Sequence, residues 1–397
     1  MSGTAPLSVD RSRLRAGRLA RLQAAMRARG VEACLLFNDP NIRYATGTSA
    51  MPIWSNTTFV RCALVAASGR PILFDYPNAV HLFGDAAASP GLDVRPMTAW
   101  EFYDDTETRA AAFARQVADA LRERGLTSRR IAVDRLGTPG FLALSHEGLT
   151  LTDSAPVTTS ARAVKTPEEV ELLRCNGDIV VEMLGNLERA IAPGVREREL
   201  LAILSETLLR RGGEHLATST VCSGPNTNPW RAEATARPLE AGDLVYVDTD
   251  AVGVEGYFFC VSRAFLCGDR PPTPAQRELY RVANDWIAAM KEQIRPGLSC
   301  RELAEKAPRL PAKYLPQRYE VMIHSIGLEE ESPSVAYPED PQPNGEWVLE
   351  ENMALVVELY VGEPGGREGV KLGDQVLLTA SGLRDLAPYP RCAELLG

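Results

Sequence analysis

An internal repeat constrains the fold of this 397-residue chain more than any other feature of its sequence. Residues 166–200, which begin TPEEVELL, are echoed by residues 273–303, which begin TPAQREL. Each copy has a Thr-Pro start with Glu or Gln at the third helical position, which predicts a capping box, and each continues into a long helix, a Pro-Gly break and a second helix. Two strand patterns follow each copy: 244–250 and 257–267, then 353–361 and 369–379. The duplicated unit predicts two halves related by a pseudo-twofold axis, with hairpins facing each other across a central cleft that is the expected place for a site.

The first 155 residues alternate helix and strand patterns instead. Helices are predicted near 11–29 and 106–125, and strands at 32–37, 62–67, 71–76 and 130–134. This alternation predicts a small α/β domain. The polar stretch 152–167 is the expected linker, so we place an N-terminal α/β domain at 1–155 and an α+β domain with the internal repeat at 160–397.

The net charge and the cysteine spacing limit the kinds of partner and the cellular compartment that we expect for this chain. The net charge of −9 argues against nucleic acid, which needs a basic surface, and no run of 18 apolar residues predicts a membrane span. The Arg-rich stretch 11–29 lacks the serines of a transit peptide, so we expect an ordinary amphipathic helix there. The eight cysteines form no C-x-x-C pair, which predicts reduced thiols in a cytoplasmic protein and no zinc ribbon.

Four residues have the chemistry of metal ligands. Asp248 and Asp250 end an apolar run, and because they are two apart on a predicted strand they share a face. Glu358 takes the corresponding place in the second half, and His324 lies between the halves. This set suits Mn, Fe, Co or Zn. The alternative interpretations are a solvated aspartate pair at a strand end and a hydrogen-bonded core histidine.

These motifs, in this order, resemble the creatinase, prolidase and aminopeptidase-P family, which has the pita-bread fold. The resemblance rests on the repeat and on LARLQAAMRARGVEACLLFNDPNIRYATG (19–47), HSIG (324–327), VVELY (356–360) and GVKLGDQVLLT (369–379). Three further details are similar to the dimethylsulfoniopropionate lyase branch of that family: SGPNTNPW (223–230), DTD (248–250) and HSIGLEEESP (324–333). The resemblance covers nearly the whole chain.

The chain departs from the metal-dependent members at three positions. The resemblance implies bridging carboxylates where this chain has Cys260 and Gly373, and a proton-shuttle histidine where it has Trp230. A dinuclear centre with a bridging hydroxide is therefore not expected. We expect either no cofactor or one weakly held divalent ion at the four candidate ligands. Cys260 can also be interpreted as a small buried apolar residue.

The resemblance also implies catalytic roles. Glu330, six residues after His324, takes the place of the general base of the lyase branch, and Tyr319 and His324 would hold the substrate. The other residues expected to line the substrate site are Trp54, Trp230, Glu358 and Cys260. The alternatives are a solvated acidic loop at 329–331 and core positions for the two tryptophans.

Together these features predict a non-peptidase enzyme that acts on a small amino-acid-like or betaine-like substrate. Its reaction would be an elimination with a carboxylate base, or C–N bond chemistry of the kind that creatinase performs on this fold without a metal. The alternatives are a metal-dependent Xaa-Pro dipeptidase or aminopeptidase, and a non-catalytic binding protein. Because relatives close their cleft with a neighbour's first domain, we also expect a homodimer in which residues 49–59, with Trp54, approach the partner's cleft.

Overall fold

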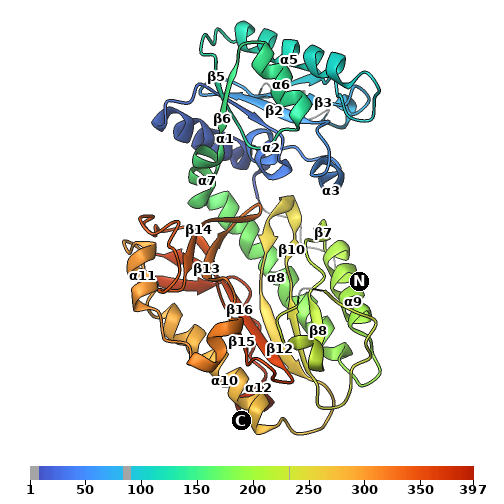
Figure 1. Ribbon diagram of the computed structural model, residues 1–397, viewed down its shortest axis with the longest axis vertical. Coiled ribbons are helices and arrows are strands. Elements are labelled where there is room, and N and C mark those ends of the chain that lie inside the picture. Colours follow the sequence, from blue (N-terminus) through green and yellow to red (C-terminus); the bar gives the residue numbers. More distant parts are fainter. Residues whose placement is uncertain (1–8, 84–90, 232) are drawn as a thin grey trace. The chain divides into compact units, whose positions relative to one another are not determined.

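The computed structural model describes residues 9–83, 91–231 and 233–397, and these divide into one unit at Asp10–Arg162 and a second at Ala163–Gly397 (Figure 1). The stretch expected as a linker forms helix α7 (Ala155–Ala163) instead. Its hydroxyls bond back to the helix, as the Thr158 Oγ1 does to the Ser154 carbonyl at 3.3 Å, and Val157 and Ala161 are buried. Small buried residues between polar ones therefore made a helix where polarity alone suggested a loop.

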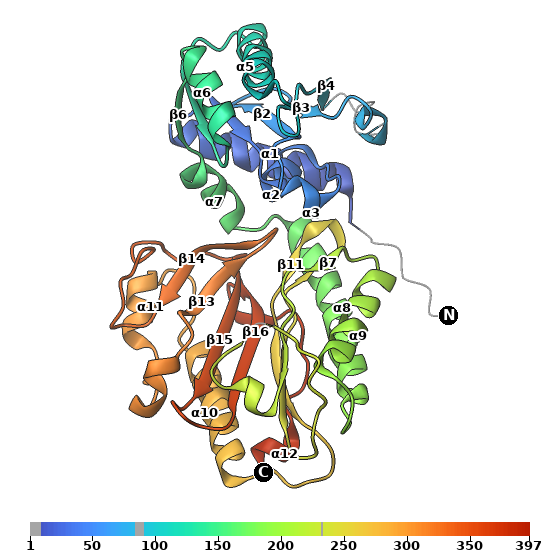
Figure 2. The ribbon, with the colours of Figure 1, turned by 45° about the vertical axis from the view of Figure 1, so that its right-hand side comes forward.

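The first unit is built on a six-stranded mixed sheet with the order β4-β3-β2-β1-β5-β6. The strands are β1 (Ala33–Leu36), β2 (Cys62–Ala66), β3 (Ile72–Asp75), β4 (Asp93–Pro96), β5 (Arg130–Val133) and β6 (Thr150–Asp153). The helices besides α7 are α1 (Arg11–Ala28), α2 (Asp39–Thr46), α3 (Pro52–Ser55), α5 (Thr106–Glu123) and α6 (Thr138–His146). Helices α5 and α6 cover one face of the sheet, and α1 and α2 cover the other (Figure 2). The α/β prediction is confirmed.

The second unit contains a large antiparallel sheet, with the order β14-β13-β15-β16-β12-β9-β8, and a small sheet, β11-β10-β7. Its strands are β7 (His215–Leu216), β8 (Val221–Ser223), β9 (Leu244–Asp248), β10 (Ala251–Val252), β11 (Phe258–Phe259), β12 (Ser262–Leu266), β13 (Val321–Ile326), β14 (Glu330–Ala336), β15 (Ala354–Gly362), β16 (Gly369–Thr379) and β17 (Gly382–Asp385), which pairs with β16. Its helices are α8 (Pro167–Ala190), α9 (Glu197–Arg210), α10 (Pro274–Lys291), α11 (Cys300–Lys306) and α12 (Ala393–Leu396). No helix of the described ranges is long and apolar enough to cross a bilayer.

The repeat has the predicted helix–helix–hairpin form. Both long helices begin with a capping box, Thr166 with Glu169 in α8 and Thr273 with Gln276 in α10. The two hairpins, however, do not face each other across a cleft. They join edge to edge, because the pairing of β12 with β16 at Ser262 satisfies backbone groups that two separate hairpins would leave open. One continuous sheet therefore carries residues of both repeats on the same face.

Helix α8 passes so close to the chain after β17 that one position tolerates only glycine. A Cβ on Gly177 would lie 1.8 Å from the Leu386 carbonyl oxygen, a backbone atom that cannot rotate away. We expect Gly177→Ala to lower the free energy of unfolding by about 1–3 kcal/mol, the usual cost of overpacking. Thermal or urea unfolding measures this.

Gly185 provides a matched control in the same helix. Its Cβ would meet nothing nearer than the flexible Arg189 guanidinium at 3.4 Å. Gly185→Ala should leave the unfolding free energy unchanged or raise it by up to about 1 kcal/mol, since alanine favours helix. Equal melting temperatures for the two variants would contradict this account of the packing.

Candidate active site

A row of side chains crosses the large sheet at the junction of the two repeats. Asp248 pairs with Ser262, Ser262 with Gly373, and Gly373 with Glu358. Directly opposed residues of neighbouring antiparallel strands point to the same face, so these four positions on β9, β12, β16 and β15 form one line. Asp248 and Glu358, at the two ends of the line, are both buried. Strand register alone thus brings two carboxylates together from the two halves of the repeat.

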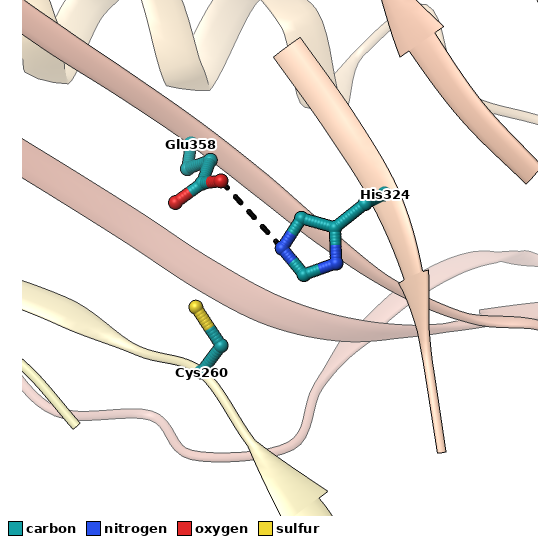
Figure 3. A group of neighbouring side chains, drawn as sticks. All are labelled: Cys260, His324 and Glu358. Atoms are coloured by element: carbon teal, nitrogen blue, oxygen red, sulfur yellow. Dashed lines mark ion pairs between the residues drawn. The ribbon is translucent and has the colours of Figure 1, made fainter. Parts of the chain in front are cut away.

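His324 and Cys260 complete this cluster. His324 lies on β13, and its Nε2 is 3.5 Å from Glu358 Oε1 (Figure 3). The ligand atoms of Cys260, His324 and Glu358 all lie within 4.8 Å of one another, as do those of Asp248, Asp250 and Cys260. The structure therefore places all four predicted ligands, with Cys260, in one buried cluster.

Cys260 acts as a neutral donor in this cluster. Its Sγ lies 3.4 Å from Asp248 Oδ1, to which the thiol donates, and its backbone N–H donates to Gln375 Oε1 at 3.0 Å. Burial, reinforced by the neighbouring carboxylates, raises the pKa of the Cys260 thiol well above its ordinary value. The thiol therefore stays protonated among these acids.

Asp250 reaches the cluster by a turn and not along a strand. Strand β9 ends at Asp248, two residues earlier than expected, and Asp250 has a positive φ of 31°. Its Oδ2 accepts a hydrogen bond of 2.6 Å from the Thr218 hydroxyl. Burial and then the nearby Asp248 carboxylate raise the pKa of Asp250 to about 7. Asp250 is therefore able to exchange a proton near neutral pH, whereas the Lys371 ammonium outweighs burial at Asp248 and holds the pKa of that carboxyl below its ordinary value.

A lysine that was not predicted from the sequence lies at the centre of the cluster. Lys371 precedes Gly373 by two residues on β16, so both point to the same face of the sheet. Its buried ammonium is ion-paired with Asp248 and lies 3.0 Å from Glu358 Oε2. Burial alone would lower the pKa of Lys371, but Asp248 and Glu358 raise it well above its usual value, so the ammonium is charged. The sequence did contain one indication of a buried lysine, since Lys371 stands between two apolar residues in VKL (370–372).

Two aromatic rings enclose the same ammonium. The Lys371 Nζ lies 4.2 Å from the centroid of the Tyr319 ring and 5.4 Å from that of Trp230, within the range of cation–π attraction. The two rings meet edge to face with centroids 5.3 Å apart. Trp230 Nε1 is buried without a hydrogen-bond partner among the described residues. Tyr319 and Trp230, both predicted to contact substrate, thus form one wall of the cluster.

Two predicted site residues are not among the side chains of this cluster. Glu330 begins β14, opposite Ile326, and its side chain is exposed. The buried acid of that loop is the next residue, Glu331, whose Oε2 lies 2.8 Å from the Lys165 ammonium. Trp54 belongs to the first unit, so the described structure does not place it beside the cluster.

The donor set does not fit a pair of ions held by bridging carboxylates. Gly373 contributes no ligand, and a Cβ at this position would already lie 3.1 Å from Ser262 Oγ and 3.2 Å from Glu358 Cβ. The second bridging position is the protonated thiol of Cys260. The Lys371 ammonium lies between the two carboxylates that remain. One set of side chains near enough to share a single ion consists of Cys260, His324 and Glu358, of which Cys260 would have to lose its proton to bind.

Comparison with known proteins agrees with this architecture. Residues 171–380 match metallopeptidase family M24, and residues 18–164 match the creatinase/prolidase N-terminal domain. Dimethylsulfoniopropionate lyases DddP of Roseovarius nubinhibens and Roseobacter denitrificans are each 33% identical over 98% of this chain, covering 89% and 88% of their own lengths. An Xaa-Pro dipeptidase of Pyrococcus furiosus is 28% identical over 58% of this chain and 64% of its own. The prolidase structure from Thermococcus sibiricus, at 20% identity, covers 97% of this chain and 98% of its own with a TM-score of 0.78, which establishes the fold.

Proposed function

The chain belongs to metallopeptidase family M24, and we propose that within this family it is an enzyme acting on a small amino-acid-like or betaine-like substrate, not a peptidase. The observation that carries the proposal is the row Asp248–Ser262–Gly373–Glu358. It has no side chain at Gly373 to bridge two ions, and the ammonium of Lys371 is paired with the carboxylates at its two ends. The residues therefore do not fit a pair of ions with a bridging hydroxide, which would supply the nucleophile for an amide bond. The nearly full-length similarity to two lyases supports the same choice.

Elimination is the reaction class that these groups fit. A base removes the proton beside the substrate carboxylate, the C–H electron pair forms a carbon–carbon double bond, and the bond to the leaving group breaks. With dimethylsulfoniopropionate the products are dimethyl sulfide and acrylate, and with an amine in place of the sulfide the same step breaks a C–N bond. The buried charges favour a substrate with a cationic group, because Asp248 and Glu358 exceed the single Lys371 by one negative charge.

A substrate panel tests the proposal. The chain should release dimethyl sulfide from dimethylsulfoniopropionate, or convert another small betaine or creatine, and leave Gly-Pro and Ala-Pro intact. Headspace gas chromatography and amino-acid analysis measure the products. Cleavage of the dipeptides at about 1–10³ per second, with no conversion of the small substrates, would make the chain a peptidase. Conversion of no substrate together with tight binding of one would make it a binding protein.

We propose Glu330 as the general base, on its spacing from His324. Its exposed side chain must be covered by substrate for this role, because a base works best out of water. Glu330→Gln should lower kcat about 10²–10⁴-fold with little change in KM. Glu329→Gln, one residue away, is the matched control and should retain wild-type kcat. Wild-type kcat in Glu330→Gln would pass the role to His324 or Asp250 in the buried cluster.

We also propose that the chain forms a homodimer through the first unit. Trp54 stacks on Tyr76 and Phe102 with ring centroids 5.3 and 6.4 Å apart, and Ile53 and Phe102 beside it are 64% and 77% exposed. An exposed apolar patch of this kind suits a second copy of the chain, which would bring Trp54 to a partner's site. Light scattering should give a dimer that Ile53→Asp with Phe102→Asp converts to a monomer. A wild-type monomer at micromolar concentration would contradict the proposal.

A further inference from the structure

We propose that Lys371 is the built-in cation of this site. Its ammonium takes the place between Asp248 and Glu358 where a divalent ion would lie if these two carboxylates shared one, and it holds both without a metal. Lys371 is thus a positioning residue, which acts through the carboxylates that it pairs. This inference concerns the cluster and not the reaction, so it goes beyond the proposed function and its test requires no substrate.

The strand geometry explains how the ammonium reaches this place. Lys371 lies opposite Tyr360, two residues along β16 from Gly373. Two residues of strand span about 7 Å, which an extended lysine side chain can cover. Gly373 lies between Ser262 and Glu358 and puts no side chain on the face of the sheet toward which Lys371 points. A glycine at 373 and a lysine at 371 therefore put a cation, and no third carboxylate, on this face of the sheet.

The surroundings of the ammonium are those of a fixed internal charge. The ammonium meets Asp248 and Glu358, and the ring centroids of Tyr319 and Trp230 lie 4.2 and 5.4 Å from it. Two buried carboxylates on one face are costly unless a positive charge pairs with them, and Lys371 provides it. A divalent ion bound to the same carboxylates would lie within a few ångströms of the ammonium, and their repulsion makes the two cations mutually exclusive.

Metal titration of Lys371 variants tests the exclusion. Wild type and Lys371→Met are purified with a chelator, freed of it, and titrated with Co²⁺ and Mn²⁺ by calorimetry and visible absorption. Lys371→Met should bind one ion per chain at least 100-fold more tightly than wild type, because it keeps Asp248, Glu358 and His324 and loses the competing charge. Lys371→Arg keeps a cation and should bind no more tightly than wild type.

Lys165 provides the matched control, since it is the second fully buried, carboxylate-paired lysine, with Glu331 at 2.8 Å. Lys165→Met should lose stability without any gain in ion affinity. Equal affinity in wild type and Lys371→Met, or an equal gain in Lys165→Met, would overturn the proposal. If Lys371→Met does not fold, the melting temperature of the wild-type protein provides the test. A melting temperature that neither a chelator nor millimolar Mn²⁺ changes supports a built-in cation. A rise with Mn²⁺ overturns the proposal.

Discussion

The ion triad of Lys371 with Asp248 and Glu358 is the constraint on which the rest of the site depends. The sheet register places the two carboxylates on one buried face, and unpaired charges there would cost several kcal/mol each. The rings of Trp230 and Tyr319 lie against the positive charge of Lys371. Burial and the neighbouring carboxylates raise the pKa values of Cys260 and Asp250, and the ammonium opposes that rise without cancelling it.

The internal repeat explains why the triad draws on both halves of the second unit. Asp248 comes from the hairpin of the first copy, and Glu358 and Lys371 come from the hairpin of the second. The hairpins meet where Ser262 pairs with Gly373, so the row crosses the junction of the two copies. Neither copy could form the cluster alone. The close approach of α8 at Gly177 packs the long helix of the first copy against the chain that follows the hairpin of the second.

Much of this arrangement could be predicted from the sequence, and the failures have identifiable causes. The repeat, the capping boxes and the convergence of Asp248, His324 and Glu358 were predictable because periodicity and ligand chemistry are local signals. Lys371 was not predicted because lysine is not a typical metal ligand. Only the strand register shows that its ammonium faces the two carboxylates.

The acidic loop illustrates a second limit. The pairing of β13 with β14 shifts register between His324 and Ser325, and a shift of one residue exchanges the faces of a strand. Glu331 is therefore buried against Lys165, and Glu330 points to solvent. Residue spacing alone could not determine which of these acids would lie inside. The backbone at Asp250 could not be predicted from residue spacing either. A turn with positive φ, and not the expected strand, brings Asp250 into the cluster.

Replacing an ion by an ammonium changes which reactions such a site can support. A divalent ion neutralises carboxylates and also offers an open position at which water becomes hydroxide near neutral pH. An ammonium does only the first, because it has no coordination position and its N–H groups already face Asp248, Glu358 and the aromatic rings. A metal-dependent peptidase needs the activated water to hydrolyse a peptide bond, whereas elimination needs only a base, a held carboxylate and a leaving group. On the proposal that Lys371 is the built-in cation, it therefore selects among reactions: it pairs the two buried carboxylates without supplying a bound hydroxide.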